Sequence, residues 1–365
     1  MNASSGLGGR LFFIDALKAL GSQFIVLHHL AFYGPMSDWT HRIAPDLVAW
    51  FSQDARMAVQ VFLVVAGFLA ARSLAPDGVL LPRRPRRLLW QRYVRVALPY
   101  IAALLVAMLC TELARRAMTH DSLPDRPHLD QFIAHALLVQ SVLGMESLSA
   151  GVWYVAIDFQ LYALLLGLLW LARHGPAQDR LPVPWVKLLA AVLVVASLFH
   201  FNREPEWDSW ALYFFGAYGL GVMTHWCTRS EAVWHASGRW VMAALVAATL
   251  LALAIDFRTR IALALVVSML LGLAQLQGWL HTWPRSRVVA YLGRISYSVF
   301  LLNFPVALVV NALFTRYANP DPLVQTLGVL LAWLACNAAG ALFHHTVELR
   351  LSQWGRTRGP LPAMA

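Results

Sequence analysis

Ionisable residues in the first apolar segment are the strongest candidates for chemistry in this chain. The segment covers residues 11–33 and is long enough to cross a bilayer as one helix. Because ionisable groups are costly at membrane depth, each one there is a candidate functional residue. At about 100° per residue, Asp15, Lys18 and His29 fall on one face of the helix, whereas His28 points away. This polar stripe predicts a helix that lines a polar cavity.

A general base and a cation can be assigned along this stripe. Histidine is the side chain best suited to proton transfer near neutral pH, so His29 is the candidate base. Lys18 lies about 16 Å away along the helix and would meet an anionic group of a donor that carries a long arm. In the structural alternative, Lys18 pairs with Asp15 or extends to the interface, and His29 is a satisfied interfacial histidine. The stripe alone leaves both interpretations open.

Two arginines one helical turn apart, Arg92 and Arg95, begin the third apolar segment. Their planar guanidinium groups match phosphate oxygens in a bidentate manner, so the pair could clamp a phosphate. The alternative is an ordinary basic helix flank that is attracted to anionic lipid. We interpret the neighbouring run RRPRR at 83–87 as a topology and lipid signal rather than a site.

Asp158 is a carboxylate inside the apolar segment 152–172. It could orient a histidine and stabilise its imidazolium, as a carboxylate does in a catalytic triad. The structural alternative is a partner for an arginine. Glu348, at the end of the last apolar segment, could pair with Arg92, Arg95 or Lys18, although a helix-end glutamate is more often solvated.

Composition places the chain in the membrane. Of its 365 residues, 59% are hydrophobic and 13% are charged, whereas a soluble domain carries about 25% charged residues. The net charge of +10 comes from Lys and Arg in short loops between apolar segments, which favours a membrane protein over nucleic-acid binding. The three cysteines lie in separate apolar segments and predict neither disulfides nor a metal site.

The predicted fold is an all-α bundle of about ten transmembrane helices. We expect a single transmembrane domain over 1–350 and a short cytoplasmic tail over 351–365, with both termini cytoplasmic because the basic loops then share one side. The apolar stretch 130–144 is short, so we expect it to be interfacial or re-entrant. The expected spans are 11–33, 56–73, 92–114, 152–172, 184–201, 209–227, 239–256, 260–279, 288–314 and 323–345.

Five stretches stand out in order along the chain: IDALKALGSQFIVLHH (14–29), VFLVVAGFLAAR (61–72), RYVRVALPY (92–100), WYVAIDFQLY (153–162) and LGRISYSVFLLNFPV (292–306). Together they resemble the integral-membrane acyltransferase 3 family, which modifies bacterial surface sugars. The chain differs from the family's usual pattern in having Lys18 for arginine, Asp158 for glutamate and Asn303 where many members have histidine.

The resemblance implies an acyltransferase of the bacterial cytoplasmic (inner) membrane. It implies an acyl-CoA donor, with acetyl-CoA favoured, and an acceptor hydroxyl on a carbohydrate or glycolipid, with no tightly bound cofactor. It also implies an essential histidine at His29 and donor-binding arginines at Arg92 and Arg95, to which we add Lys18. Asp158 is expected to orient His29. Direct transfer and a covalent acyl-histidine relay both stay open.

Two other classes of protein compete with this interpretation. A transporter or flippase for a sugar or lipid-linked intermediate would use the same polar cavity without consuming acyl-CoA. Such proteins often have paired halves, and the sequence shows no clear internal repeat. A sensor or scaffold would carry buried charges only for helix packing, and five family-like stretches in order argue against it.

Overall fold

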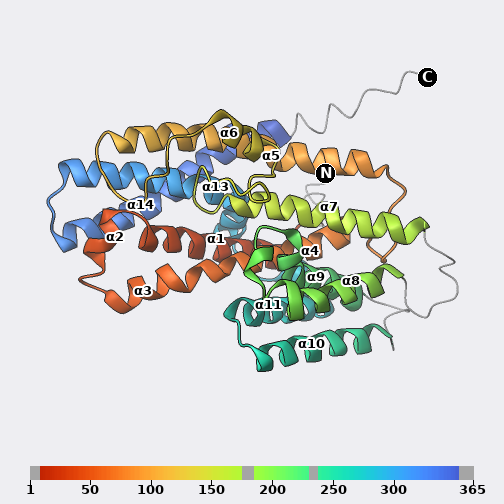
Figure 1. The fold of residues 1–365 in the computed structure, drawn as a ribbon. Coiled ribbons are helices and arrows are strands. Elements are labelled where there is room, and N and C mark those ends of the chain that lie inside the picture. Colours follow the sequence, from red (N-terminus) through yellow and green to blue (C-terminus); the bar gives the residue numbers. More distant parts are fainter. Residues whose placement is uncertain (1–8, 175–184, 230–236, 353–365) are drawn as a thin grey trace, which may run out of the picture. The chain divides into compact units, whose positions relative to one another are not determined.

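A computed structural model describes residues 9–174, 185–229 and 237–352, and these residues form helices with no strand (Figure 1). The predicted all-α membrane class is therefore confirmed. The predicted tail at 351–365 lies almost entirely outside the described residues.

Each of the ten expected spans contains a helix. Shorter helices lie between them: α2 (Pro35–Thr40), α3 (Pro45–Gln53), α6 (Leu129–Ala136) and α12 (Trp279–Thr282). The ten are α1 (Phe12–Phe32), α4 (Val59–Leu74), α5 (Pro85–Arg115), α7 (Trp153–His174), α8 (Trp185–Ala196, continued by a π-helical turn over Ser197–Phe201), α9 (Ala211–Thr228), α10 (Ser237–Ile255), α11 (Thr259–Leu276), α13 (Arg287–Tyr317) and α14 (Pro322–Phe343, continued by a π-helical turn over His344–Glu348).

Seven helical stretches in the described residues are long and apolar enough to cross a membrane by length and composition. The expected spans outside that set are α1, α8 and α9. α1 contains the ionisable stripe, and α8 with its π-helical turn covers only 185–201. α9 is buried at 16 of its 18 residues, so it faces protein rather than lipid and needs less hydrophobicity.

The helix in the stretch 130–144 is too short to span the membrane. α6 has eight residues, about 12 Å of helix. The backbone leaves helical geometry at Leu138, whose φ is +61°. His135 is fully buried, and its two ring nitrogens bond to Gln131 O (2.8 Å) and Leu148 N (3.2 Å). Burial lowers the pKa of His135, which matches a neutral ring that donates once and accepts once.

The described residues form two compact units. The first takes its residues from Met1–Ala19, Val59–Leu88 and Ile157–Gly293, and the second from Leu20–Ala58, Leu89–Ala156 and Arg294–Ala365. Four helices, α1, α5, α7 and α13, contribute residues to both units. The prediction of one transmembrane domain stays a prediction.

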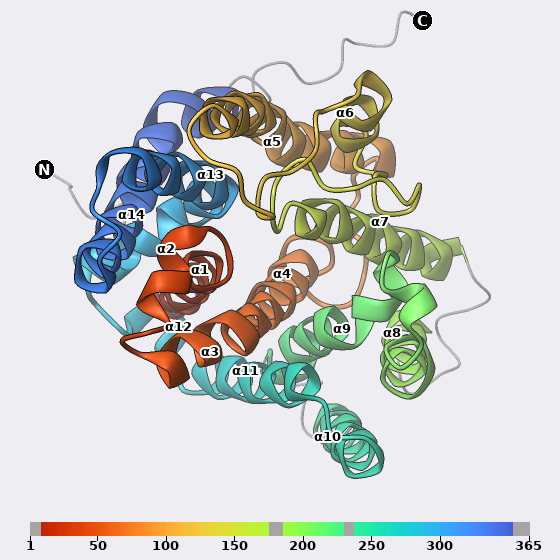
Figure 2. The ribbon, with the colours of Figure 1, turned by 60° about the vertical axis from the view of Figure 1, so that its left-hand side comes forward.

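The first unit is built around α9, which packs against α4, α8, α10 and α11 (Figure 2). The α4 and α9 backbones touch at two glycines. A Cβ on Gly67 would lie 1.9 Å from the carbonyl oxygen of Tyr218, and a Cβ on Gly221 would lie 1.9 Å from that of Val64. Only glycine permits this approach at either position. The Gly-containing stretch at 61–72 therefore has a packing role.

In the second unit, side-chain hydrogen bonds join the middle of α1 to α14. Gln23 donates to Asn337 Oδ1 at 2.8 Å and accepts from the Trp333 indole at 2.8 Å. α14 also packs against α2, the short helix that follows α1. A Cβ on Gly340 would lie 2.4 Å from the Val299 side chain, so α14 lies close against α13. These contacts hold the part of α1 that carries His29.

Adding a methyl group at the α4–α9 contact should destabilise the protein. Gly67→Ala or Gly221→Ala must separate two backbones, and overpacking of this kind typically costs about 1–3 kcal/mol. Gly167→Ala, on α7, is the control. It meets no atom within 4 Å, so it should leave stability unchanged or raise it by about 0.5–1 kcal/mol through helix propensity. Thermal unfolding in detergent would measure the three variants, and equal midpoints would contradict the packing role.

Candidate active site

His29 is buried in the second unit, with 4% of its surface exposed, and its Nδ1 contacts the Oδ1 of Asn303 on α13. The Asn303 amide nitrogen donates to the carbonyl oxygens of Val299 (3.2 Å) and Phe300 (2.8 Å). Because the amide nitrogen is used in this way, the oxygen faces the ring and accepts the Nδ1 proton. His29 is therefore assigned the tautomer whose Nε2 carries a lone pair, as a general base requires.

The free edge of the His29 ring faces the backbone at Gly151. A Cβ at this position would lie 3.2 Å from His29 Cε1 and 3.5 Å from His29 Nε2. Gly151 has φ +78°, a conformation that side chains other than glycine rarely adopt. Among the described residues, Nε2 makes no hydrogen bond. Glycine at 151 thus leaves free the space beside the basic nitrogen that a side chain at this position would fill.

Aromatic rings enclose the rest of the imidazole. Tyr33 and Phe304 meet it edge-on, at ring-centroid distances of 5.5 and 6.2 Å. Tyr154, from the family-like stretch on α7, packs edge-on against Phe300 at 5.6 Å. An apolar surround of this kind limits water around the base and strengthens electrostatic interactions within the site.

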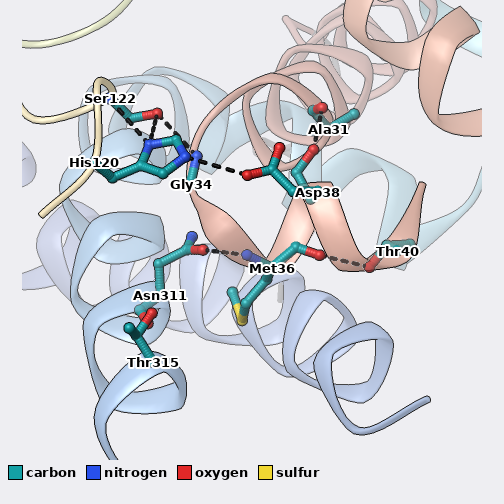
Figure 3. Close-up of polar contacts among 10 residues, drawn as sticks. Ala31, Gly34, Met36, Asp38, Thr40, His120, Ser122, Asn311 and Thr315 are labelled. Carbon is teal, nitrogen blue, oxygen red and sulfur yellow. Dashed lines mark hydrogen bonds and ion pairs between the residues drawn. The ribbon is translucent and has the colours of Figure 1, made fainter. Parts of the chain in front are cut away.

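The segment that follows α1 is anchored on two sides, as Figure 3 shows. Gly34 N–H donates to Ser122 Oγ (2.9 Å), and Ser122 Oγ also contacts His120 Nδ1 (2.9 Å). His120 Nε2 lies 3.3 Å from a carboxylate oxygen of Asp38. From α13, Asn311 Oδ1 accepts the N–H of Met36 at 3.0 Å. These bonds fix the end of α1 less than two turns beyond His29.

The two adjacent histidines face different partners, as the helical wheel predicted. His28 Nδ1 bonds to the carbonyl oxygen of Phe51 on α3, at 3.2 Å, whereas His29 faces Asn303 on α13. The two rings therefore have distinct environments, and only His29 belongs to the α1–α13 contact.

Lys18 lies in an ion cluster at the start of α1, in the first unit. Its ammonium is 3.3 Å from Asp15, and Asp15 also pairs with Arg10 at 2.9 Å. Arg10 in turn donates to the carbonyl oxygen of Ala290 at 2.6 Å. The pairing that the sequence raised as the structural alternative for Lys18 is thus present. With 28% of its side chain exposed, Lys18 retains accessible surface for an anionic ligand.

The arginine pair lies on α5 in the second unit, with Arg92 half-buried and Arg95 exposed. The next residue along, Val96, accepts a hydrogen bond through its carbonyl oxygen from Tyr297 Oη at 2.8 Å. This bond places the start of the second-unit part of α13 beside the arginine pair. The donor-binding role of the pair stays a prediction.

Glu348 belongs to a polar cluster that the sequence did not predict. Its carboxylate accepts from Ser298 Oγ at 2.5 Å and bonds to His344 Nδ1 at 2.8 Å. The i, i+4 spacing of His344 and Glu348 was a usable signal, although the π-helical turn that holds them was not visible in the sequence.

Asp158 is buried on α7, with 5% of its surface exposed, and belongs to the first unit. His29 belongs to the second, so the contact expected between them stays a prediction. Asn303 and Gly151, which the sequence left unassigned, both lie against the His29 ring. No group of three or more His, Cys, Asp and Glu side chains that could hold a metal occurs in the described residues.

Fold and site together define a multi-pass helical membrane protein with a buried, oriented histidine. A family model described as an acyltransferase domain matches residues 11–340. The chain belongs to this family, so the resemblance is confirmed and the general activity is acyl transfer by a membrane protein. No curated protein and no solved structure matches the chain.

Removing the Asn303 side-chain oxygen should allow both neutral tautomers of His29 to form. In Asn303→Leu the Nδ1 proton loses its acceptor, so both tautomers become populated. Histidine-selective ¹⁵N NMR of the protein in detergent would detect the change. Asn202→Leu is the control, because it removes a buried amide of the first unit that bonds to the Tyr213 carbonyl oxygen. An unchanged His29 spectrum in Asn303→Leu would contradict the assigned role.

Proposed function

We propose that the protein is an O-acyltransferase that moves an acetyl group from acetyl-CoA to a hydroxyl of a cell-surface carbohydrate or glycolipid. The observation that carries this proposal is the buried His29, whose Nε2 is left as a free base by the Asn303 contact. Membership of the acyltransferase family supports the reaction class. The proposed location is the bacterial cytoplasmic membrane, with both termini in the cytoplasm.

In the proposed reaction, His29 Nε2 removes the proton from the acceptor hydroxyl as its oxygen attacks the thioester carbonyl. The new C–O bond forms and the C–S bond breaks. The imidazolium then returns the proton to the departing thiolate. In the relay variant, Nε2 itself attacks the carbonyl, the C–S bond breaks, and the thiolate leaves with the imidazole proton. The acceptor oxygen then attacks the acyl carbon, the C–N bond breaks, and the acceptor's proton returns to the imidazole. Both routes need an unprotonated Nε2, which is why the tautomer matters.

Orientation of the ring is assigned to Asn303 rather than to Asp158. A triad carboxylate accepts the Nδ1 proton, and here the Asn303 oxygen already does so. Asp158 is retained in the proposal as a buried carboxylate that stabilises the imidazolium. Arg92, Arg95 and Lys18 are proposed to hold the donor's phosphates and arm, because arginine forks suit phosphate oxygens.

The transporter or flippase alternative would use the same polar stripe without an acyl donor. No observation on the described residues favours it over acyl transfer, and the family match favours acyl transfer.

Loss of His29 should abolish transfer. His29→Ala removes the base, and removal of a general base typically lowers the rate about 10²–10⁴-fold. His28→Ala loses the hydrogen bond to the Phe51 carbonyl oxygen and ring contacts with His29 and Phe32, but it leaves the His29–Asn303 contact in place, so it should change the rate less than about tenfold. Radiolabelled acetyl-CoA and membranes that contain the natural acceptor would measure incorporation. Wild-type incorporation by a correctly inserted His29→Ala variant would refute the assignment of His29.

Donor binding should depend on the arginine pair. In Arg92→Ala/Arg95→Ala, two charge-assisted contacts are lost, and the dissociation constant for acetyl-CoA should rise at least about 100-fold. Isothermal titration calorimetry on the protein in nanodiscs would measure it. The charge-matched control is Arg116→Ala/Arg126→Ala, two exposed arginines of the second unit. Equal losses in both double variants would indicate general charge, and no acetyl-CoA binding by the wild type would count against the proposed function itself.

A further inference from the structure

A basic pocket opens in the first unit, at the start of α5 and the end of α7. Its volume is about 410 Å³, within the range of small-molecule sites. We call it the Arg83–Arg173 pocket. Its lining includes Arg83, Arg84 and Pro85 on one side and Trp170, Arg173 and His174 on the other.

The charge of this pocket is unbalanced within the described residues. Its lining has three arginines and no carboxylate, and none of the three guanidinium groups forms an ion pair there. Like charges held together repel one another unless an anion joins them. Pro85 is also the first residue of α5, so the positive end of that helix adds to the field. The pocket is therefore suited to phosphate groups.

An aromatic face lies beside the arginines. The Trp170 indole is 45% exposed and packs on the His174 ring, with centroids 4.7 Å apart. His174 is held in place by a hydrogen bond from its Nδ1 to the Trp170 carbonyl oxygen at 2.8 Å. Exposed aromatic faces beside guanidinium groups suit a nucleobase that carries phosphates. A lipid headgroup offers the same phosphate chemistry without the base.

We propose that the Arg83–Arg173 pocket binds the adenosine 3′,5′-bisphosphate end of the acyl-CoA donor. This inference rests on the proposed function and extends it, because it assigns the nucleotide to Arg83, Arg84, Trp170 and Arg173. The run at 83–87, which we interpreted from the sequence as a topology and lipid signal rather than a site, divides into two arginines that line the pocket and two, Arg86 and Arg87, that do not.

The first test uses adenosine 3′,5′-bisphosphate as the probe. Calorimetry on the full chain in phosphatidylcholine nanodiscs should show binding by the wild type. Arg83→Gln/Arg84→Gln should weaken it at least about tenfold, as expected for lost charge-assisted hydrogen bonds. The charge-matched control Arg86→Gln/Arg87→Gln should stay within about twofold. Arg173→Gln serves as a second pocket variant if the double variant does not fold. No binding by the wild type, or equal losses in both double variants, would overturn the proposal.

The second test separates this inference from the proposed function. Dissociation constants are compared for acetyl-CoA and for S-acetylpantetheine, which lacks the nucleotide. The pocket variants should weaken acetyl-CoA binding at least about tenfold and leave S-acetylpantetheine binding unchanged. If the wild type binds acetyl-CoA and the pocket variants bind it equally well, only the pocket assignment fails. If the wild type binds neither donor, the proposed function fails.

The alternative ligand, the phosphate of a lipid headgroup, is tested by native mass spectrometry of the protein from nanodiscs that contain phosphatidylglycerol. A lipid headgroup site would be identified if the wild type retains this lipid, Arg83→Gln/Arg84→Gln loses it, and the wild type does not bind the bisphosphate. That result would overturn the nucleotide assignment. Equal lipid retention in the wild type and the pocket variant, with bisphosphate binding lost only in the variant, supports the proposal.

Discussion

The hydrogen bond between the Asn303 amide and the His29 ring is the contact on which the candidate site depends. A buried imidazole has two nitrogens that compete for one proton, and only a fixed partner decides which nitrogen keeps it. The two backbone carbonyls that bind the Asn303 amide nitrogen turn its oxygen toward the ring. A neutral amide therefore performs the orienting task that a carboxylate performs in a triad, without placing a second buried charge beside the base.

Such a bond is useful only if the helices that carry its two ends are fixed. On α1, the Gln23 bonds to α14 and the Gly34 and Met36 bonds beyond the helix end lie on either side of His29. On α13, Gly340 of α14 packs directly against Val299, whose carbonyl oxygen also receives the Asn303 amide. Packing and polar contacts thus converge on one turn of α13. A shift of either helix would break the contact that orients the ring.

The helical class, the approximate limits of ten helices and the face on which His29 lies could all be predicted from the amino-acid sequence. They follow from hydrophobic run length and helical period, which are local properties. Observed helix boundaries differ from the predicted ones where a residue outside the apolar run favours a helix end. For example, α5 begins at Pro85 rather than near Arg92, because proline is well suited to the first turn of a helix. The short α6 also followed from run length.

Asn303 and Gly151, two of the residues that lie against the His29 ring, could be identified only from the packing of the helices. Asn303 is 274 residues from His29 in the chain, and the sequence alone showed it only as a departure from the usual histidine. Gly151 carries no side-chain chemistry, and its role exists only because a ring edge lies against its backbone. The partners of Glu348 and the pocket beside Trp170 likewise depend on how helices pack. Periodicity fixes the face of a helix, but it does not specify the neighbour that the face will meet.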